Sequence, residues 1–330
     1  MCFENEKKLK FFKVNEQNEG KRLDKLVLSK LDNLTRNQVK KFINNGKILV
    51  NQAKTKPGYN VKRGDEIKVH LSSIISSSLP GELSERSLVP EKIDLEIIYE
   101  DEHLIVVNKP KNMVVHPAPG NFKGTLVNAL LNYDNELSTL GGEYRPGIIH
   151  RLDKNTSGAL LVAKNNRVHS CLKEKFKRRE INREYLAICR GHYPENKSII
   201  EAPVGRHPSD RKRMTVIEGG RYAKTKVKVL RKFNYKGFPY SYLKVMPVTG
   251  RTHQIRVHLG YFGYPLVGDE IYGAKRKKEK NELNSIINGQ ALHAFKIMFY
   301  HPFKGSRVVF KASLPEDFSA LIRRLARFHE

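Results

Sequence analysis

The sequence predicts an α+β protein in two parts: a small unit of two helices and a hairpin, then a larger domain built on a mixed, mainly antiparallel sheet. Three observations support this. The 330 residues suit two domains better than one. Residues 72–90 are rich in Ser, as flexible linkers are. After residue 91, strand-like runs outnumber helical ones. We therefore expect a module over 1–75 with its core at about 20–71, a linker over 76–90, and a domain over 91–330.

The N-terminal unit begins with an alternating strand pattern within residues 10–20. Apolar residues at helical spacing then predict two helices, marked by Leu23, Leu26, Val27 and Leu31 and by Val39, Phe42 and Ile43. Thr35 is the expected N-cap of the second helix, Gln38 completes a capping box, and Gly46 is the expected C-terminal cap. Short strands follow at 48–50, 59–61 and 67–71, separated by Pro-Gly and Gly-Asp turns.

The larger domain shows apolar, strand-like runs interrupted by a few helical patterns. We expect strands at 97–99, 104–108, 160–163, 185–189, 225–230, 242–247 and 308–312. We expect helices at 125–131, 166–176, 252–262 and 318–328. Residues 275–290 are charged and polar, which predicts a loop. The segment 252–262 also alternates, so a strand is the alternative there; if it is a helix, Thr252 is the expected N-cap.

The charge balance indicates a polyanionic partner. Lys and Arg total 61 against 34 Asp and Glu, which gives a formal net charge of +27 and a pI of about 9.9. A surface of this kind binds nucleic acid with release of counterions. A lysine-rich protein with no such partner is the weaker alternative. A membrane surface is less favoured, because no basic amphipathic anchor stands out.

The cysteine pattern and the apolar runs exclude several classes of protein. The three cysteines, Cys2, Cys171 and Cys189, show no metal-binding spacing, and their odd number argues against a disulfide framework. The N-terminal residues lack the apolar core of a secretory signal, and no run of 18 apolar residues is present. We therefore expect a cytoplasmic protein without a metal site. The many histidines match no common metal-site spacing.

The densest run of reactive side chains is the stretch 145–158, RPGIIHRLDKNTSG, which precedes an apolar strand. Asp153 lies there among cations, and nearby positive charge keeps a carboxylate ionised. An ionised carboxylate can act as a covalent nucleophile or as a base. From the residues alone, an Asp that caps a turn is the commoner case.

The run HRLDKNTSG at 150–158 resembles the signature of the RluA/RluD-like family of pseudouridine synthases. Further segments resemble the family in the same order along the chain: 108–110 with 114–117, 183–187, 202–208 with Arg211 and Met214, 249–258, and 290–294 with 301–302. Residues 22–25, 35–36, 46–51 and 61–65 resemble the RNA-binding module first described in ribosomal protein S-four. The two resemblances together cover nearly the whole chain.

The resemblance implies a set of site residues. Asp153 matches the nucleophilic aspartate, Tyr185 the tyrosine that stacks on the target uracil, and Arg256 the arginine that pairs with the aspartate. Arg151 matches an arginine that holds the RNA open after the base has flipped out. Further substrate contacts are expected from His150, Arg251, His253 and Leu292. In the N-terminal module, RNA contacts are expected from Arg22, Lys25, Arg36, Lys40, Lys41 and Lys47.

The implied reaction is the isomerisation of uridine in structured RNA, most directly large-subunit ribosomal RNA. The base must leave the stack to be reached. The resemblance implies no metal, nucleotide or redox cofactor, and a monomer is the default expectation. Two positions depart from the usual signature: Asn155 stands where an acid is commoner, and Ala159 where a larger apolar residue is usual. Neither is the implied nucleophile, although substrate choice could differ.

Competing interpretations stay open at this point. Tyr185 alternates with Leu186 along a strand, so it could be half-buried packing. Arg256 could be a surface arginine whose stem covers apolar neighbours. At the level of the whole protein, a non-catalytic RNA-binding or ribosome-assembly protein is the main alternative, and a metal-dependent RNA hydrolase is a third. Asp153 distinguishes the synthase from the non-catalytic binding protein, because a binding protein does not need this carboxylate.

Overall fold

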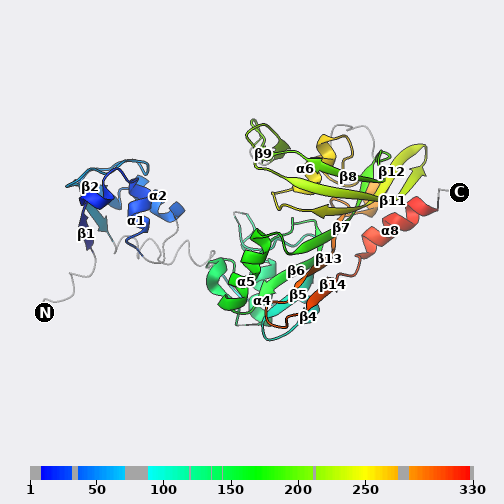
Figure 1. Ribbon diagram of the computed structural model, residues 1–330, viewed down its shortest axis with the longest axis horizontal. Helices are drawn as coiled ribbons and strands as arrows, with labels where there is room; N and C mark the ends of the chain where they lie inside the picture. The colour runs from blue at the N-terminus through cyan, green and yellow to red at the C-terminus, as the bar shows by residue number, and fades with distance from the viewer. Residues whose placement is uncertain are drawn as a thin grey trace. The chain divides into compact units, whose positions relative to one another are not determined.

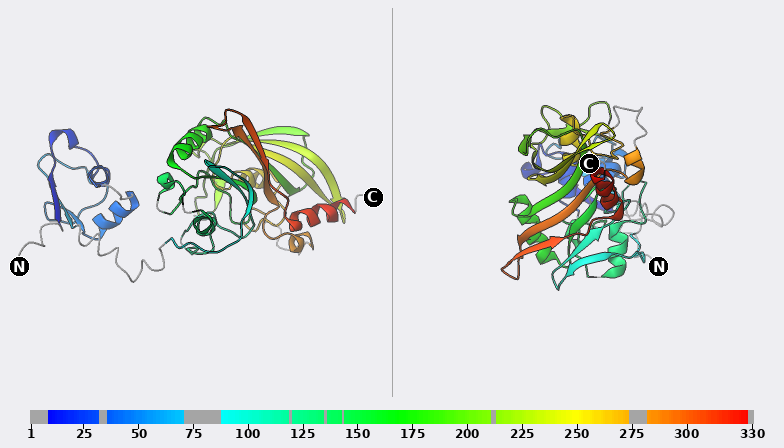
Figure 2. Two further views of the ribbon diagram at one scale, coloured as in Figure 1. Left: turned by 90° about the horizontal axis from the view of Figure 1, so that it is seen from below. Right: turned by 90° about the vertical axis from the view of Figure 1, so that its right-hand side faces the viewer.

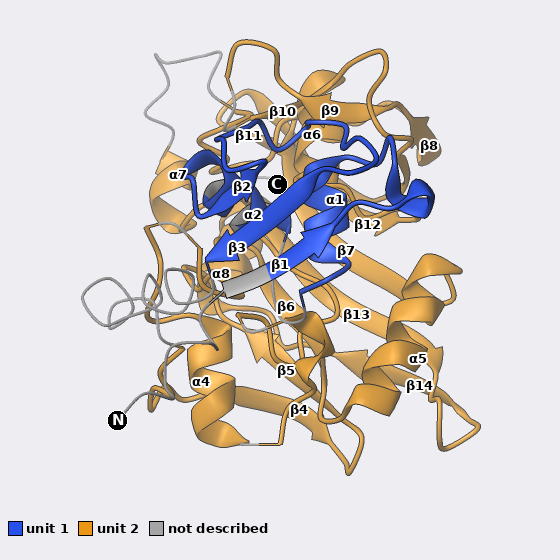
Figure 3. Ribbon diagram, turned by 90° about the vertical axis from the view of Figure 1, so that its left-hand side faces the viewer, with its two compact units in different colours: residues 1–87 blue, residues 88–330 orange. Residues whose placement is uncertain are grey.

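The structure is a computed structural model that describes residues 9–31, 36–70, 88–118, 120–134, 136–142, 144–210, 213–273 and 282–327. The chain separates into two compact units, residues 1–87 and 88–330 (Figures 1 and 3). Both carry helices and strands, so the predicted α+β class is confirmed. Among the described residues, no helix is long and apolar enough to cross a bilayer.

The first unit packs two helices against a small antiparallel sheet. Its elements are β1 (Leu9–Lys13), η2 (Glu16–Asn18), α1 (Leu23–Leu28), α2 (Arg36–Asn44), β2 (Ile48–Val50) and β3 (Glu66–His70), with sheet order β1-β3-β2. The helical stripes predicted from the sequence, including Leu23, Val39 and Ile43, are fully buried in one cluster. Gly46 has a φ of +71° just after α2, as expected of a C-terminal cap.

Two local predictions in this unit have other outcomes. The predicted strand at 59–61 is wrong: the segment forms only an isolated bridge between Arg22 and Asn60. Its backbone bonds to residues 20–23, where the Leu23 amide donates to the Tyr59 carbonyl at 2.8 Å and the Val61 amide donates to the Lys21 carbonyl at 3.0 Å. The Tyr59 hydroxyl also donates to the Asp65 carboxylate at 3.0 Å. The predicted capping box begins at Thr35, which lies outside the described residues.

The second unit is built on one large sheet. Its order is β4-β5-β6-β13-β7-β12-β11-β8, and β14 pairs with β13. These strands are β4 (Glu96–Glu100), β5 (Leu104–Lys109), β6 (Ser157–Ala163), β7 (Asn182–Arg190), β8 (Lys197–Glu201), β11 (Lys224–Tyr235), β12 (Phe238–Pro247), β13 (Leu292–Tyr300) and β14 (Arg307–Lys311). A separate hairpin pairs β9 (Val204–Arg206) with β10 (Met214–Val216). Every described pair is antiparallel except β6 with β13, which confirms the mainly antiparallel sheet.

The central strand β13 was not predicted from the sequence. It pairs parallel with β6 and antiparallel with β7, so it joins the two halves of the sheet (Figure 1). A register shift between His293 and Lys296 interrupts its pairing with β7. Such a bulge breaks the two-residue alternation by which strands are recognised.

The helices are α4 (Leu126–Tyr133), α5 (Asn166–Lys177), α6 (Gln254–Tyr261), α7 (Glu282–Ile286) and α8 (Glu316–Ala326), with a short η3 (Thr139–Gly141). Alternate residues of β5 face different helices. Ile105 and Val107 share a core cluster with α4 and α6, whereas Leu104 and Val106 pack in the cluster that contains α5. The C-terminal α8, red in Figure 2, packs on residues of β7, β11 and β12.

Three further sequence predictions need correction. The predicted loop at 275–290 contains α7, whose Leu283 is fully buried beside α8 residues. The last residues of the predicted linker belong to the second unit, since Leu88 packs on its core and the Val89 carbonyl accepts from the Asn128 side chain. The segment 252–262 is a helix, but it starts at Gln254 and its N-cap is His253 in the left-handed region, not Thr252.

Candidate active site

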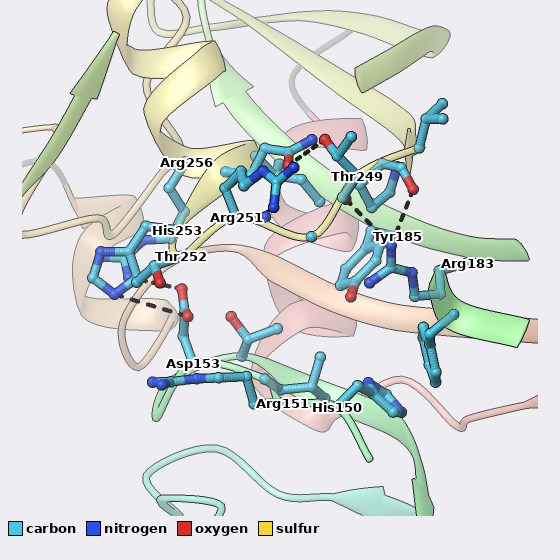
Figure 4. Close-up of a pocket in the computed structure, with 18 of the residues that line it drawn as sticks. His150, Arg151, Asp153, Arg183, Tyr185, Thr249, Arg251, Thr252, His253 and Arg256 are labelled. Atoms are coloured by element: carbon cyan, nitrogen blue, oxygen red, sulfur yellow. Dashed lines mark hydrogen bonds and ion pairs between the residues drawn. The ribbon is translucent and has the colours of Figure 1, made fainter. Parts of the chain in front are cut away.

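A cavity of about 610 Å³ opens in the second unit, and Asp153 lies in its wall (Figure 4). The lining comes from five stretches of the chain: the loop before β6, the end of α5 with the start of β7, Arg221 ahead of β11, the turn after β12 with the first residues of α6, and the first residue of β13. The predicted site residues His150, Arg151, Asp153, Tyr185, Arg251, His253, Arg256 and Leu292 all line it. The tertiary structure therefore brings this whole set together.

The loop that carries Asp153 is held at both ends. The Thr156 amide donates to the Asp153 carbonyl at 3.0 Å, which closes a turn. Gly158 follows with a φ of +118°, and a Cβ there would lie 2.3 Å from the Ala294 carbonyl oxygen of β13. Only glycine allows β6 and β13 to approach so closely. The Asp153 side chain keeps 17% of its surface exposed, so it can reach a substrate.

Lys109, the last residue of β5, also holds this loop in place through hydrogen bonds. Its fully buried Nζ donates to the carbonyls of Pro110, Met113 and Lys154 at 2.6, 2.9 and 3.1 Å. Burial lowers the pKa of this ammonium to about 7, and the charge of Asp153 opposes that shift. Three acceptors match the three donors of the protonated form. Lys109 was not predicted as a site residue; in the sequence it belongs to the segment 108–110 that resembles the family.

Arg256 on α6 joins two carboxylates. Its Nη1 donates to Asp153 Oδ2 at 3.0 Å, while Nε and Nη2 donate to Asp269 at 2.7 and 2.9 Å. Burial disfavours the guanidinium charge, but the bonds and charge of Asp269, followed by Asp153, outweigh it and raise the Arg256 pKa. Asp269 also accepts from the amides of Ile271 and Tyr272. Arg256 is thus buried and aimed, which excludes the surface-arginine interpretation.

Asp269 was not predicted as a site residue from the sequence. Nor were two polar side chains that hold α6 in place through hydrogen bonds. Gln254 accepts from the Thr249 hydroxyl and donates to Thr225 Oγ1 at 2.9 Å. His258 places Nδ1 against the same Thr225 hydroxyl and Nε2 against the Ala202 carbonyl. The only local feature that could have drawn attention to Asp269 is its position directly after a Val-Gly pair. Nothing local links it to a residue 13 positions earlier.

His253 lies on the other oxygen of Asp153. Its Nε2 is 3.8 Å from Asp153 Oδ1, and its Nδ1 is 2.8 Å from the Tyr272 hydroxyl. That hydroxyl accepts from the Met214 amide, so its own proton is free to point at Nδ1. Nε2 then carries the imidazole proton and faces the carboxylate. Burial lowers the His253 pKa, although Asp153 opposes the shift, so the ring is neutral at neutral pH.

Tyr185 and Leu292 belong to the apolar lining of the cavity, which also includes Phe176. Figure 4 shows the phenol directed into the space that Asp153 faces. Burial raises the pKa of the Tyr185 hydroxyl, so it is protonated at neutral pH. Arg183 stands beside it and donates to the carbonyls of Pro247 and Thr249. A flat ring, an apolar side chain and fixed donors suit a flipped-out base.

The mouth of the cavity is basic. Arg151 is exposed there, and Arg251 donates through Nε to the Tyr222 carbonyl. Burial lowers the Arg251 pKa, and the neighbouring charges of Arg221 and Arg179 lower it further. The last two cations also line the cavity and were not predicted. A bound phosphate would reduce the repulsion between these neighbouring positive charges, so the cluster is suited to bind RNA phosphates.

His150 has a partner within the protein. Its Nε2 accepts from the Leu161 amide at 2.9 Å, its ring packs against Phe176, and burial lowers its pKa to about 3. Through Nε2 the ring holds the loop on β6. Its Nδ1 is buried and has no partner among the described residues, and the contact with substrate stays a prediction. Among the described residues, no group of His, Cys, Asp and Glu side chains is arranged to hold a metal ion.

In the first unit, two of the predicted RNA contacts have a structural partner. Arg22 and Arg36 both donate to the buried carboxylate of Asp24, at 3.0–3.1 Å, while their side chains stay 43% and 46% exposed. Lys25 on α1 is exposed, and Lys47 lies over the Phe42 ring. The side chain of Lys41 lies outside the described residues.

Asp24→Asn is expected to destabilise the first unit. The bond from Arg22 lowers the Asp24 pKa most, burial opposes it, and Arg36 lowers it further. A carboxyl whose folded pKa is depressed stabilises the fold above about pH 4 and loses this contribution as the pH falls through the folded value. The variant should lose roughly 1.5–3 kcal/mol at neutral pH and should lack this part of the acid dependence. Urea unfolding of the full chain, followed by circular dichroism at several pH values, measures both; equal acid dependence would contradict the pairing.

Comparison with known proteins agrees with this arrangement. Residues 103–261 match the family described as RNA pseudouridylate synthase, and residues 21–67 match the "S4 domain". A Bacillus subtilis protein named "Uncharacterized RNA pseudouridine synthase YlyB" is 40% identical over 95% of this chain and 97% of its own. The Escherichia coli K12 protein named "Ribosomal large subunit pseudouridine synthase D" is 36% identical over 94% of this chain and 92% of its own.

A solved structure shares the fold. "Human RNA Pseudouridylate Synthase Domain Containing 1" aligns with a TM-score of 0.54 and 26% identity, covering 75% of this chain and 97% of that one. The family segment 103–261 spans β5 to α6, and so includes Asp153, Tyr185 and Arg256. Taken with the full-length similarity, these matches show that the chain belongs to the family of RNA pseudouridine synthases, with an N-terminal S-four RNA-binding domain.

Proposed function

We propose that this synthase isomerises specific uridines of large-subunit ribosomal RNA, with Asp153 as the nucleophile and the target base flipped into the cavity. The observation that carries the proposal is the Asp153 carboxylate: it is partly exposed in a basic cavity, is paired with Arg256 at 3.0 Å, and faces an aromatic ring. The names of the relatives from Escherichia coli and Zymomonas mobilis support the choice of ribosomal RNA.

The residues divide the work as follows. Tyr185 and Leu292 hold the uracil, and a stacked ring contributes about 1–3 kcal/mol. Asp153 attacks either the anomeric carbon of the ribose or a carbon of the uracil ring. The N1–C1′ bond breaks, the base turns, and a C5–C1′ bond forms. The bond between Asp153 and the nucleoside then breaks, which restores the carboxylate, and N1 gains a proton as C5 loses one. Arg256 orients the carboxylate for this attack. Arg151 occupies the space in the RNA from which the base has turned out.

The basic rim and the S-four domain together account for binding to structured RNA. Phosphate contacts provide affinity without reading sequence. Lys25 and Lys40 lie on α1 and α2 of that domain, and Arg151, Arg221 and Arg251 lie at the cavity. In this proposal the lysines of the S-four domain anchor the RNA, whereas the arginines at the cavity place one uridine over Asp153.

Replacing Lys25 and Lys40 by Gln should weaken RNA binding and flatten its salt dependence. Each lost phosphate contact removes about 0.7–0.9 from the slope of log affinity against log salt, so the double variant should lose roughly 1–2. Filter binding of a large-subunit RNA fragment between low and moderate salt measures the slope. Lys228→Gln, a change at an exposed cation of β11, is the control. An unchanged slope would show that the domain does not clamp RNA through these side chains.

The proposed function is tested most directly by mapping pseudouridine in total RNA from cells with and without this gene. Loss of one or a few modified positions in large-subunit RNA, restored by the wild-type gene and not by Asp153→Asn, is the expected result. Loss confined to transfer RNA would retain the enzyme class but refute the proposed substrate.

A further inference from the structure

A second cavity, of about 360 Å³, adjoins the first. Asp153, His253 and Arg256 line both cavities, so the ion pair forms a shared wall between them. The rest of the second lining comes from the segment after β5, the end of the Asp153 loop, residues 268–271 and residues 289–290. None of the residues assigned to the uracil, such as Tyr185 and Leu292, lines this space.

The lining has the chemistry of a nucleotide site. Val115 and Ile271 supply apolar surface, and His116, Asn155 and Gln290 supply uncharged polar groups. Arg151 and Lys154 line the cavity as well and are exposed to solvent, where they can meet a phosphate. The lining thus mixes apolar surface with polar and charged groups, the exposed carboxylate of Glu270 among them. The apolar and uncharged polar groups suit a base, and the two cations suit the backbone that carries it.

Two of the polar groups have an unused hydrogen-bonding atom. Within the described part of the chain, His116 Nδ1 and Asn155 Oδ1 are buried and have no partner. His116 is only 7% exposed, and burial followed by the charges of Arg145 and Arg151 lowers its pKa to about 4. Its neutral ring and the Asn155 amide can each both donate and accept. Buried polar atoms without partners are costly, which indicates a binding role.

The position of Asn155 is set by close packing. Gly289 has a φ of +74°, and a Cβ there would lie 2.5 Å from the Asn155 Cβ and 2.6 Å from its Nδ2. Gly268, packed on the Gly289 carbonyl, is equally restricted. Gln290 is tied by its Nε2 to the Thr156 hydroxyl at 2.9 Å. The floor of the cavity is therefore rigid, as a site that discriminates between bases requires.

We propose that this second cavity binds the base of a nucleotide that flanks the target uridine in the same RNA strand, with His116 and Asn155 contacting its edge. The inference rests on the proposed function, since it takes the first cavity as the uracil site. The shared wall makes the two sites neighbours, and the exposed cations Arg151 and Lys154 are available to the backbone that would connect the two nucleotides. Contacts to flanking nucleotides are a known means by which base-flipping enzymes choose their site.

The test is a cycle that combines changes in RNA and in protein. Synthetic hairpins carry the mapped uridine and an abasic nucleotide at each flanking position in turn. Single-turnover rates of tritium release from C5 are measured for the wild type, Asn155→Ala, His116→Ala and the control Asn132→Ala, an exposed change on α4. At one flanking position, base removal should slow the wild type by roughly tenfold. There it should slow the Asn155 and His116 variants by less than about twofold, because the contact is already lost.

Several outcomes would overturn the inference. The first is a full tenfold response in both variants, and the second is a wild type indifferent to every flanking base. If Asn155→Ala unfolds at a lower temperature than the wild type, Asn155→Leu, which keeps the size of the side chain and removes its polar atoms, takes its place in the cycle. These results are distinct from failure of the proposed function. In that case the wild type would release no tritium from any hairpin, or Asp153→Asn would release it normally.

Discussion

Asp153→Asn is expected to abolish pseudouridine formation, with a loss of at least about 1000-fold in single-turnover rate. The amide keeps the size of the side chain but cannot form the transient bond to the nucleoside. It also gives up the charge that Arg256 meets at 3.0 Å. RNA affinity should change by less than about threefold, because the basic rim and the S-four domain are untouched. Tritium release and filter binding measure the two quantities on the same RNA.

The control is Asp94→Asn, which removes an exposed carboxylate outside the cavity and should have wild-type activity. Conversion that survives in Asp153→Asn would remove the nucleophile from the proposal and revive the reading of Asp153 as a turn residue. Loss of both activity and binding would instead indicate that the loop holds the RNA. The expected separation of the two effects is therefore the informative result.

Asp269→Asn is expected to have the second-largest effect, a fall in kcat of roughly 100-fold with a smaller change in KM. Asp269 does not line the first cavity, so it acts through Arg256 as a positioning residue. Its two bonds to the guanidinium, at 2.7 and 2.9 Å, hold Nη1 against the nucleophile. Breaking one member of a buried charge pair costs about 3–5 kcal/mol, and part of this cost should appear in the barrier of the chemical step.

The readout must separate positioning from folding. Asp269→Asn should therefore be compared with the wild type below the onset of its thermal unfolding, alongside Glu195→Gln, an exposed carboxylate change. A positioning role predicts a loss in kcat with bound RNA at saturation. A merely structural role predicts that the folded fraction falls while kcat per folded molecule is kept, and that result would contradict the assignment.

Much of the fold could be predicted from short patterns in the sequence. The spacing of apolar residues along the chain was enough to predict the two helices of the first unit, the buried strands β5 and β6, and the helices α4, α5 and α8. Where prediction failed, a longer-range contact had decided the structure. β13 is bulged where it pairs with β7, and residues 59–61 are bonded through their backbone to residues 20–23. The helix α7, within a polar stretch, exists because Leu283 is buried against α8.

By itself, the sequence determined the family, the two-part organisation and the identity of the acid proposed as nucleophile, because motifs and periodicities are local properties of the chain. Only the tertiary structure decided that Asp153 meets Arg256 across 103 residues, that Asp269 and Lys109 hold this pair and its loop, and that a second cavity lies beside them. The physical reason is that a distance between remote residues depends on how the sheet is paired and how the side chains are packed. Neither leaves a trace in the spacing of residues along the chain.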